Sequence, residues 1–223
     1  MIKYFIRTTL ERRLDNSVIR ELGENYTLLI DTEHKPVESF IQQLSIVSEY
    51  DSVLLEDDVI LCNNFKQRIE EVINKNKDKL INFFTFPMDY FTSHITFYEF
   101  RYNQCTYYPK GISKLIANEM KNLICRKYNF EYDVLEGFAI KNLKLVYLVY
   151  RPCLVQHNDI KSLIQNNFNI KRITPYFIDY LEELGISYED AYKPENKQKL
   201  IDLMNKKFEK RGENKWEKNL TNG

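Results

Sequence analysis

Short apolar runs, separated by helical or polar segments, alternate along residues 1–150 and restrict the possible folds more than any other feature of the chain. Runs this short, without polar alternation, are typical of strands buried on both faces of a sheet. They occupy residues 2–7, 26–30, 52–55, 59–61, 79–86, 104–108 and 145–150. Amphipathic segments at 36–47, 65–76 and 112–127 have the spacing of helices, and Pro36 stands where a helix would begin. The pattern predicts an α/β three-layer sandwich with a mostly parallel central sheet.

The C-terminal part of the chain has a different composition. From Thr174 onward Glu, Lys, Asn and Leu recur at helical spacing, which predicts a pair of helices with a frayed end. We therefore expect one main domain over residues 1–165 and a helical C-terminal extension over 166–223. The extension is also a candidate contact for a homodimer.

Charge, cysteine content and hydropathy exclude several classes of protein. Lys plus Arg and Asp plus Glu both number 32, so no overall field attracts the chain to nucleic acid or an anionic membrane. The cysteines form no CxxC pair, and we expect buried free thiols: Cys62, Cys105, Cys125 and Cys153. No run approaches the roughly 20 apolar residues that span a bilayer, and the N-terminus lacks the pattern of a secretion signal, so we expect a cytoplasmic protein.

Three consecutive acids, Glu56, Asp57 and Asp58, directly follow the apolar run 52–55 and precede the apolar run 59–61. Like charges this close disfavour ionisation unless a cation lies among them. Oxygen ligands of this kind suit Mg²⁺ or Mn²⁺, which substrate phosphates commonly help to coordinate. The alternative is a solvated acidic turn, but the apolar flanks favour a metal site.

The segment 50–61, YDSVLLEDDVIL, resembles the DxD-type motif of GT-A glycosyltransferases in its LEDD form, found in lipopolysaccharide-type and phage-encoded members. A second segment, RPCLVQH at 151–157, resembles a late strand of such enzymes that ends in a metal-binding histidine. The resemblance implies that Asp58 and His157 bind Mn²⁺ or Mg²⁺. It implies that Glu56 or Asp57 contacts the ribose or a metal-bound water. Taken alone, His157 would be read as a hydrogen-bonded surface histidine.

The loops after the first two strands fit the same interpretation. GT-A enzymes bind the nucleotide with the loop that follows the first strand, where this chain has Arg7, Thr8, Thr9, Arg12 and Arg13. Asp31 follows the second strand, where such enzymes place a group that reads the base. Each of these residues by itself would be a solvated loop residue, and their shared position at strand ends is what favours a nucleotide site.

An inverting glycosyltransferase needs a carboxylate that takes the proton of the acceptor hydroxyl. The candidates are Asp133 and Glu136, with Glu136 preferred because Gly137 beside it would let a substrate approach. The spacing of the two acids equally fits an N-cap with its capping-box partner. Aromatic residues in 83–108, including Tyr90, Phe91, His94 and Tyr98, are candidates for stacking on a sugar or base.

The predicted function is transfer of a sugar from a nucleoside-diphosphate sugar, with UDP-sugars preferred, to the hydroxyl of a glycan, a protein or a modified DNA base. A nucleotidyltransferase or a nucleotide-sugar hydrolase would use the same acids. The six glycines include no evident phosphate-binding loop of the kind those enzymes usually have. A non-enzymatic phage protein that binds a nucleotide is the remaining alternative.

Overall fold

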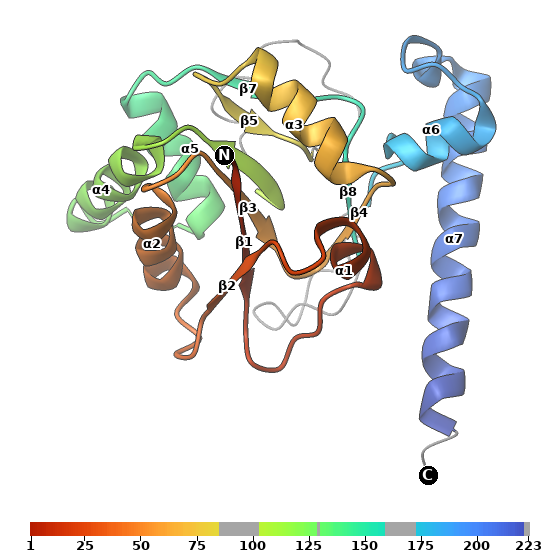
Figure 1. Ribbon diagram of the computed structural model, residues 1–223, viewed down its shortest axis with the longest axis horizontal. Coiled ribbons are helices and arrows are strands. Elements are labelled where there is room, and N and C mark those ends of the chain that lie inside the picture. Colours follow the sequence, from red (N-terminus) through yellow and green to blue (C-terminus); the bar gives the residue numbers. More distant parts are fainter. Residues whose placement is uncertain (85–102, 129, 159–172, 221–223) are drawn as a thin grey trace.

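The computed structural model describes residues 1–84, 103–128, 130–158 and 173–220, with side chains up to Glu209. Within these residues the chain forms a central sheet between two layers of helices, and a long helix stands beside this body (Figure 1). The predicted α/β sandwich with a mostly parallel sheet and a C-terminal helical part is confirmed.

The central sheet has six strands in the order β2-β1-β3-β6-β5-β7. β1 is parallel to both neighbours, β5 is parallel to β7, and β6 runs antiparallel between β3 and β5. The register places Arg7 opposite Glu56, at the carboxyl ends of adjacent strands. The strand bounds are Lys3–Thr8 for β1, Thr27–Ile30 for β2, Ser52–Glu56 for β3, Leu80–Asn82 for β5, Cys105–Tyr108 for β6 and Tyr147–Val149 for β7.

Helices cover both faces of this sheet because successive strand residues point to opposite sides. On one face Phe5 packs in a cluster with α2 (Pro36–Val47), α4 (Ile112–Cys125) and α5 (Tyr132–Asn142). On the other face Tyr4 and Ile6 pack with α1 (Asn16–Leu22) and α3 (Phe65–Lys75). Pro36 begins α2, as predicted, since a proline at the first position loses no helical hydrogen bond.

A small second sheet pairs β4 (Val59–Leu61) with β8 (Val155–His157) in antiparallel register, with Val59 opposite His157. The chain therefore leaves the central sheet at Glu56 and enters the second sheet at Val59, with only Asp57 and Asp58 between them. α1 packs against β4, and the buried Ser17 hydroxyl accepts a hydrogen bond of 2.9 Å from the Leu61 amide.

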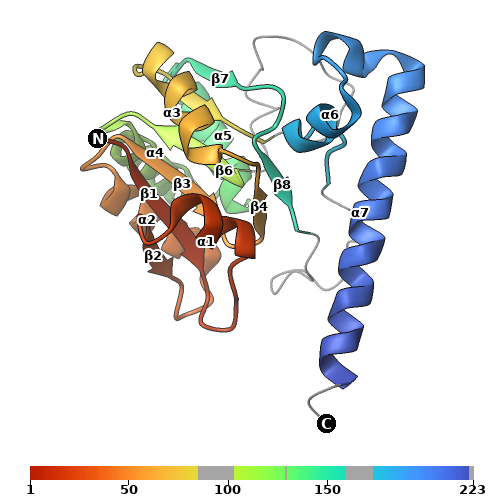
Figure 2. The same cartoon turned by 45° about the vertical axis from the view of Figure 1, so that its right-hand side comes forward.

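The C-terminal residues form two α-helices, α6 (Ile178–Leu184) and α7 (Pro194–Leu220), which correspond to the predicted pair of helices. A 3₁₀ helix (Glu189–Tyr192) lies in the segment that connects them. Figure 2 shows α6 lying between the body and α7. Buried side chains from all three elements, among them Leu181, Ala191 and Leu200, belong to the same cluster as Tyr4 and Ile6. The C-terminal helices thus share a core with the central sheet.

Two expectations are corrected. The sequence predicts only a loop after the first strand, but this segment also contains α1, whose seven residues are too short for a recognisable periodic pattern. The Asp15 side chain caps α1 by accepting a hydrogen bond from the Ser17 amide. Cys125 is exposed at the end of α4, whereas Cys62, Cys105 and Cys153 are buried free thiols.

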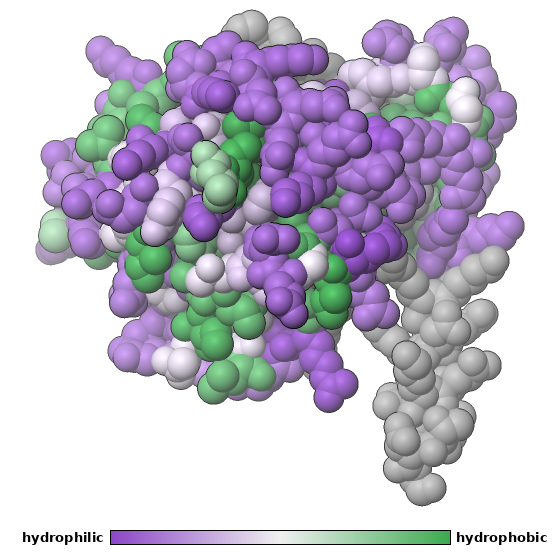
Figure 3. Space-filling view, in the orientation of Figure 1, coloured by the Kyte–Doolittle hydropathy of each residue, from purple (hydrophilic) through white to green (hydrophobic). Residues whose placement is uncertain are grey.

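No helix in the described part of the chain is long and apolar enough to cross a bilayer. The face drawn in Figure 3 is largely hydrophilic, and its hydrophobic residues form separate patches.

Candidate functional site

The acidic triplet lies at the junction of the two sheets. Glu56 is the last residue of β3, and Asp57 and Asp58 form the turn that leads into β4. Ligands of open α/β sheets bind at the carboxyl ends of strands, and the ends of β1 and β3 meet here. The parallel pairing of β1 with β3 therefore brings Arg7 and the acidic triplet, which lie at the ends of separate strands in the sequence, to the same carboxyl edge of the sheet.

Asp58 and His157 lie together although 99 positions separate them along the chain. The Nε2 atom of His157 is 3.2 Å from Oδ2 of Asp58, and both side chains are largely buried. The pairing of β4 with β8 causes this approach, because His157 ends β8 opposite Val59. The backbone adds a link, since the Asn158 amide donates to the Asp58 carbonyl oxygen at 2.7 Å.

The chemistry of this pair is compatible with a divalent cation. Two ligands at adjacent corners of an octahedron with metal–ligand distances of about 2.1 Å are about 3.0 Å apart, close to the observed separation. Within residues 1–84, 103–128, 130–158 and 173–209, no cluster of three or more His, Cys, Asp or Glu residues is arranged to hold a metal. Among these residues, a cation at this junction would therefore have only Asp58 and His157 as a paired set of protein ligands, and other oxygen ligands would have to complete its shell.

Arg7 is enclosed beside the triplet. Its guanidinium carbon lies 4.4 Å from the ring centre of Phe40 and 4.3 Å from that of Tyr132. Its Nε donates to Gln43 at 2.8 Å, and its Nη1 is 3.3 Å from Glu56 Oε1. The sequence predicts that Arg7 binds the nucleotide, but its enclosure by two aromatic rings and Gln43 favours a role in positioning Glu56.

The surroundings oppose ionisation of two acids of the triplet. Burial raises the pKa of Glu56, with Asp58 adding to the shift and Arg7 opposing it. The Tyr132 hydroxyl donates to Glu56 Oε1 at 2.7 Å. Burial likewise raises the pKa of Asp57, while a hydrogen bond with Thr8 and the charge of Arg12 lower it. A cation at this junction would offset both penalties.

The other residues predicted to bind the nucleotide lie either at the ends of β1 and β2 or on the loop that follows β1. Thr8 ends β1, and its carbonyl oxygen accepts from the Asp31 amide at 2.8 Å, so these residues lie side by side. The Asp31 carboxylate accepts from the amides of Glu33 and Lys35 and thereby holds its own loop. Thr9 and Arg12 lie on the loop after β1, joined by a backbone hydrogen bond of 3.3 Å, and Arg13 is exposed.

The two candidate bases differ in access. Glu136 is fully buried, and its oxygens accept from Tyr108 at 2.5 Å and from Asn103 at 2.8 Å. Burial raises the pKa of Glu136 to about 8. Asp133 is only partly buried in the first turn of α5, whose N-cap is Glu131, so the predicted capping box is wrong. Asp133 is the more accessible of the two carboxylates.

The sequence interpretation missed the residues that surround Arg7. Phe40 and Gln43 come from α2, and Tyr132 comes from the first turn of α5. Gln43 interrupts the buried face of α2, where a polar residue among apolar ones was the available signal. The aromatic candidates Tyr90, Phe91, His94 and Tyr98 lie outside the described residues.

Comparisons with known proteins identify no family. No protein-family model and no curated protein matches the chain. Among solved structures it is similar to A197 from STIV, with a TM-score of 0.43 and 14% identity over 77% of this chain and 98% of that chain. It is also similar to a protein described as a glucose-1-phosphate thymidylyltransferase from Bacillus anthracis in complex with a sucrose. That match has a TM-score of 0.40 and 12% identity over 73% of this chain and 97% of the other.

Proposed function

We propose that this chain is a metal-dependent glycosyltransferase of the GT-A type, which transfers a sugar from a nucleoside-diphosphate sugar to an acceptor hydroxyl. The observation that carries the proposal is the approach of His157 to Asp58 at the end of β3. A solvated acidic turn does not require a buried imidazole from β8, the strand that pairs with β4. A divalent-cation site at the carboxyl edge of a mostly parallel sheet would use both.

The proposed donor site extends from this pair along the ends of β1 and β2. Asp58 and His157 hold the cation, and Asp57 lies next to them with its carboxylate near Thr8 and Arg12. Bound there, Mn²⁺ or Mg²⁺ would offset the charge of the diphosphate leaving group. In this proposal Arg12 and the Thr8–Thr9 loop contact phosphate or ribose, and Asp31 contacts the base. A UDP-sugar is the proposed donor class.

Asp133 is the proposed base for an inverting reaction. Asp133 is only partly buried, whereas both oxygens of Glu136 accept hydrogen bonds inside the core. α5 carries Tyr132, which contacts Glu56, so the first turn of this helix lies beside the acidic triplet. We assign to Glu136 the role of a structural carboxyl that orients Tyr108 and Asn103.

The test is a thermal-unfolding series with UDP and UDP-glucose, each with and without Mn²⁺. We expect metal-dependent stabilisation by the nucleotide, about 2.7 kcal/mol at a hundredfold excess over Kd. Asp58→Asn keeps the size of the side chain but weakens the metal ligand, so it should abolish the stabilisation. The matched control is Glu24→Gln, which removes an exposed carboxylate and should respond like the native chain.

Product analysis by mass spectrometry then separates transfer from hydrolysis of the donor. Equal stabilisation with and without Mn²⁺, or an unchanged response of Asp58→Asn, would exclude the proposed metal pair. Failure of every nucleotide in a panel of UDP, GDP, dTDP and CMP derivatives would exclude the donor class altogether.

A further inference from the structure

A cavity lined partly by the C-terminal helices includes Asn158, which directly follows the candidate metal ligand His157. We propose that this groove binds the acceptor, and that the acceptor is an uncharged saccharide. The inference rests on the proposed function, since it assigns the partner that would receive the sugar. It adds a role for the C-terminal helices, which form one wall of the groove.

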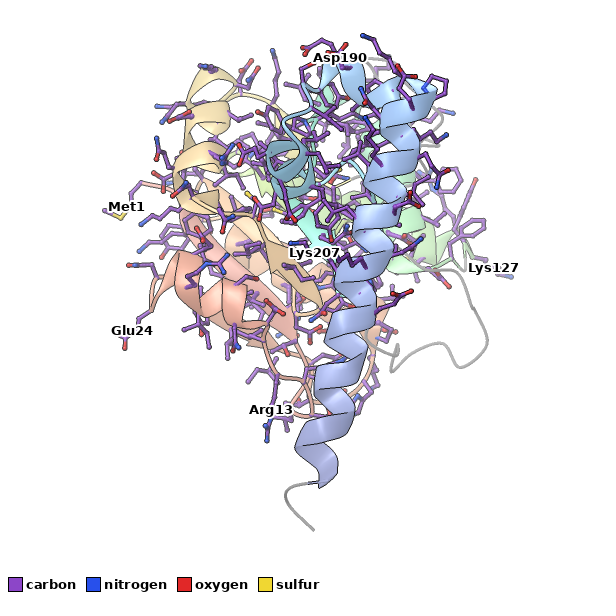
Figure 4. All side chains as sticks on the ribbon, turned by 90° about the vertical axis from the view of Figure 1, so that its right-hand side faces the viewer. Met1, Arg13, Glu24, Lys127, Asp190 and Lys207 are labelled. Atoms are coloured by element: carbon purple, nitrogen blue, oxygen red, sulfur yellow. The ribbon has the colours of Figure 1, made fainter. Side chains whose placement is uncertain are left out.

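The groove has a volume of about 610 Å³, within the range of small-molecule sites. One wall comes from α1 and β4 and the other from α6 and α7. Figure 2 shows α1 on one side of the second sheet and α6 and α7 on the other. Figure 4 places Lys207 of the α7 wall toward the centre of the view, whereas Glu24 lies at its margin. A cavity of this size can hold a short saccharide.

Asn158 connects the groove to the proposed metal pair. It directly follows His157, its amide donates to the Asp58 carbonyl oxygen at 2.7 Å, and its side chain lines the groove. The Asn158 side-chain amide also donates to Asp15 Oδ2 at 3.3 Å on the opposite wall. An acceptor in the groove would therefore lie next to the residues proposed to hold the donor diphosphate.

The lining has the groups that sugar hydroxyls require. Three amide side chains, those of Asn16, Asn63 and Asn158, offer both donors and acceptors, and the carboxylates of Asp15 and Asp179 add acceptors. A hydroxyl donates one hydrogen bond and accepts others, so this mixture suits a polyol. Tyr180 and Phe177, whose rings contact each other at 5.2 Å, supply the apolar part of one wall.

The charge of the groove selects against polyanions. Its lining contains four carboxylates, of Asp15, Asp179, Glu182 and Glu183, against two basic residues, Arg20 and Lys207. Lys207 is moreover engaged with Glu183 at 2.6 Å. A nucleic acid or another phosphate-rich acceptor would meet repulsion here, because binding such chains depends on basic contacts. Among a glycan, a protein and a modified DNA base, the groove therefore fits a neutral glycan.

The experiment fills the groove without removing a structural contact. Asn16 is exposed on the groove wall, and Asn16→Trp places an indole there; Glu24→Trp is the control at an exposed position away from the groove. Ligand-observed saturation-transfer NMR is recorded with lactose, cellobiose and maltose. We expect transfer to at least one disaccharide, a loss of affinity of at least tenfold in Asn16→Trp, and no change in Glu24→Trp.

A single-stranded oligonucleotide and a serine-rich peptide are tested in parallel. Binding of either in place of every disaccharide, or unchanged disaccharide binding by Asn16→Trp, overturns the inference. If Asn16→Trp does not fold, Asn63→Trp tests the same wall from another exposed position. Stabilisation by UDP and Mn²⁺ is measured on the same samples. If UDP and Mn²⁺ do not stabilise the native chain, the proposed function is refuted. If they stabilise it but no disaccharide binds, only the acceptor groove is refuted.

Discussion

At the scale of single residues, two glutamates near Arg7, one partly and one fully buried, show how the surroundings of a side chain determine its role. Glu56 is opposite Arg7 in the sheet register and accepts from Tyr132; burial raises its pKa, and the charge of Arg7 opposes that shift. Glu136 lies one helical turn after Tyr132 but is fully enclosed, and its pKa is about 8. Only the first of these acids belongs to the proposed donor site.

The raised pKa of Glu136 predicts a particular dependence of stability on pH. In the unfolded chain this group ionises near pH 4.5, but in the folded chain it stays protonated up to about pH 8. Its contribution to stability is therefore fully present below pH 4.5 and declines as pH rises to about 8, by up to about 1.4 kcal/mol per pH unit.

Glu136→Gln cannot ionise, so its free energy of unfolding relative to the native chain should increase from pH 5 to pH 8. Urea unfolding at several pH values measures the difference. Parallel pH profiles for Glu136→Gln and the native chain would contradict the assignment. Glu24→Gln serves as the control and should alter stability by less than about 0.5 kcal/mol at either end of the range.

At the scale of elements, the short α1 is stabilised by its contacts more than by its length. Seven residues are too few for a stable isolated helix, and α1 depends on the Asp15 cap and on packing against β4. The contact of Ser17 with the Leu61 amide joins α1 to β4, and β4 also carries the pairing that places His157. Through these contacts a helix that the sequence pattern did not reveal supports the strand that pairs with β8, and it also lines the groove.

Ser17→Ala is expected to leave the buried Leu61 amide without its acceptor. Such a loss costs about 1–3 kcal/mol in free energy of unfolding, measurable by urea denaturation. Ser45→Ala is the control, since the Ser45 hydroxyl only donates back to the Ile41 carbonyl within α2, and a change below about 0.5 kcal/mol is expected. Equal effects of the two substitutions would show that the contact between α1 and β4 contributes nothing specific.

At the scale of the whole molecule, the C-terminal helices are integrated with the body. Leu181, Leu200 and Met204 are buried in the cluster that also contains Tyr4 and Ile6 of β1. Cores this continuous usually unfold in one transition. The proposed acceptor groove lies along this same boundary, so the stability of the helical wall and the shape of the groove are connected.

Leu200→Ala should therefore destabilise the entire molecule. Leu200 is completely buried, and removing its side chain is expected to cost about 2–5 kcal/mol, seen as a lower midpoint of a single urea transition followed by fluorescence and circular dichroism. Leu115→Ala, at a half-exposed position of α4, is the control and should cost much less. A separate early transition in Leu200→Ala, with the body unaffected, would show that the C-terminal helices fold independently.

The sequence by itself determined the elements whose signal is local. Apolar runs located the strands of the sheet, and Pro36 marked the start of α2, because burial and backbone restrictions act over a few consecutive residues. The position of the acidic triplet at a strand end was also readable, since its apolar flanks lie beside it in the chain.

Only the tertiary structure decided which polar residues are enclosed in the core and which lie near the proposed site. Arg7 and Glu136 were both plausible site residues in the sequence, yet one is enclosed by two aromatic rings and the other by Tyr108 and Asn103. The approach of His157 to Asp58 likewise depends on the pairing of β4 with β8. Such contacts join residues distant in the chain, and their free energy depends on burial and partners that no local pattern encodes.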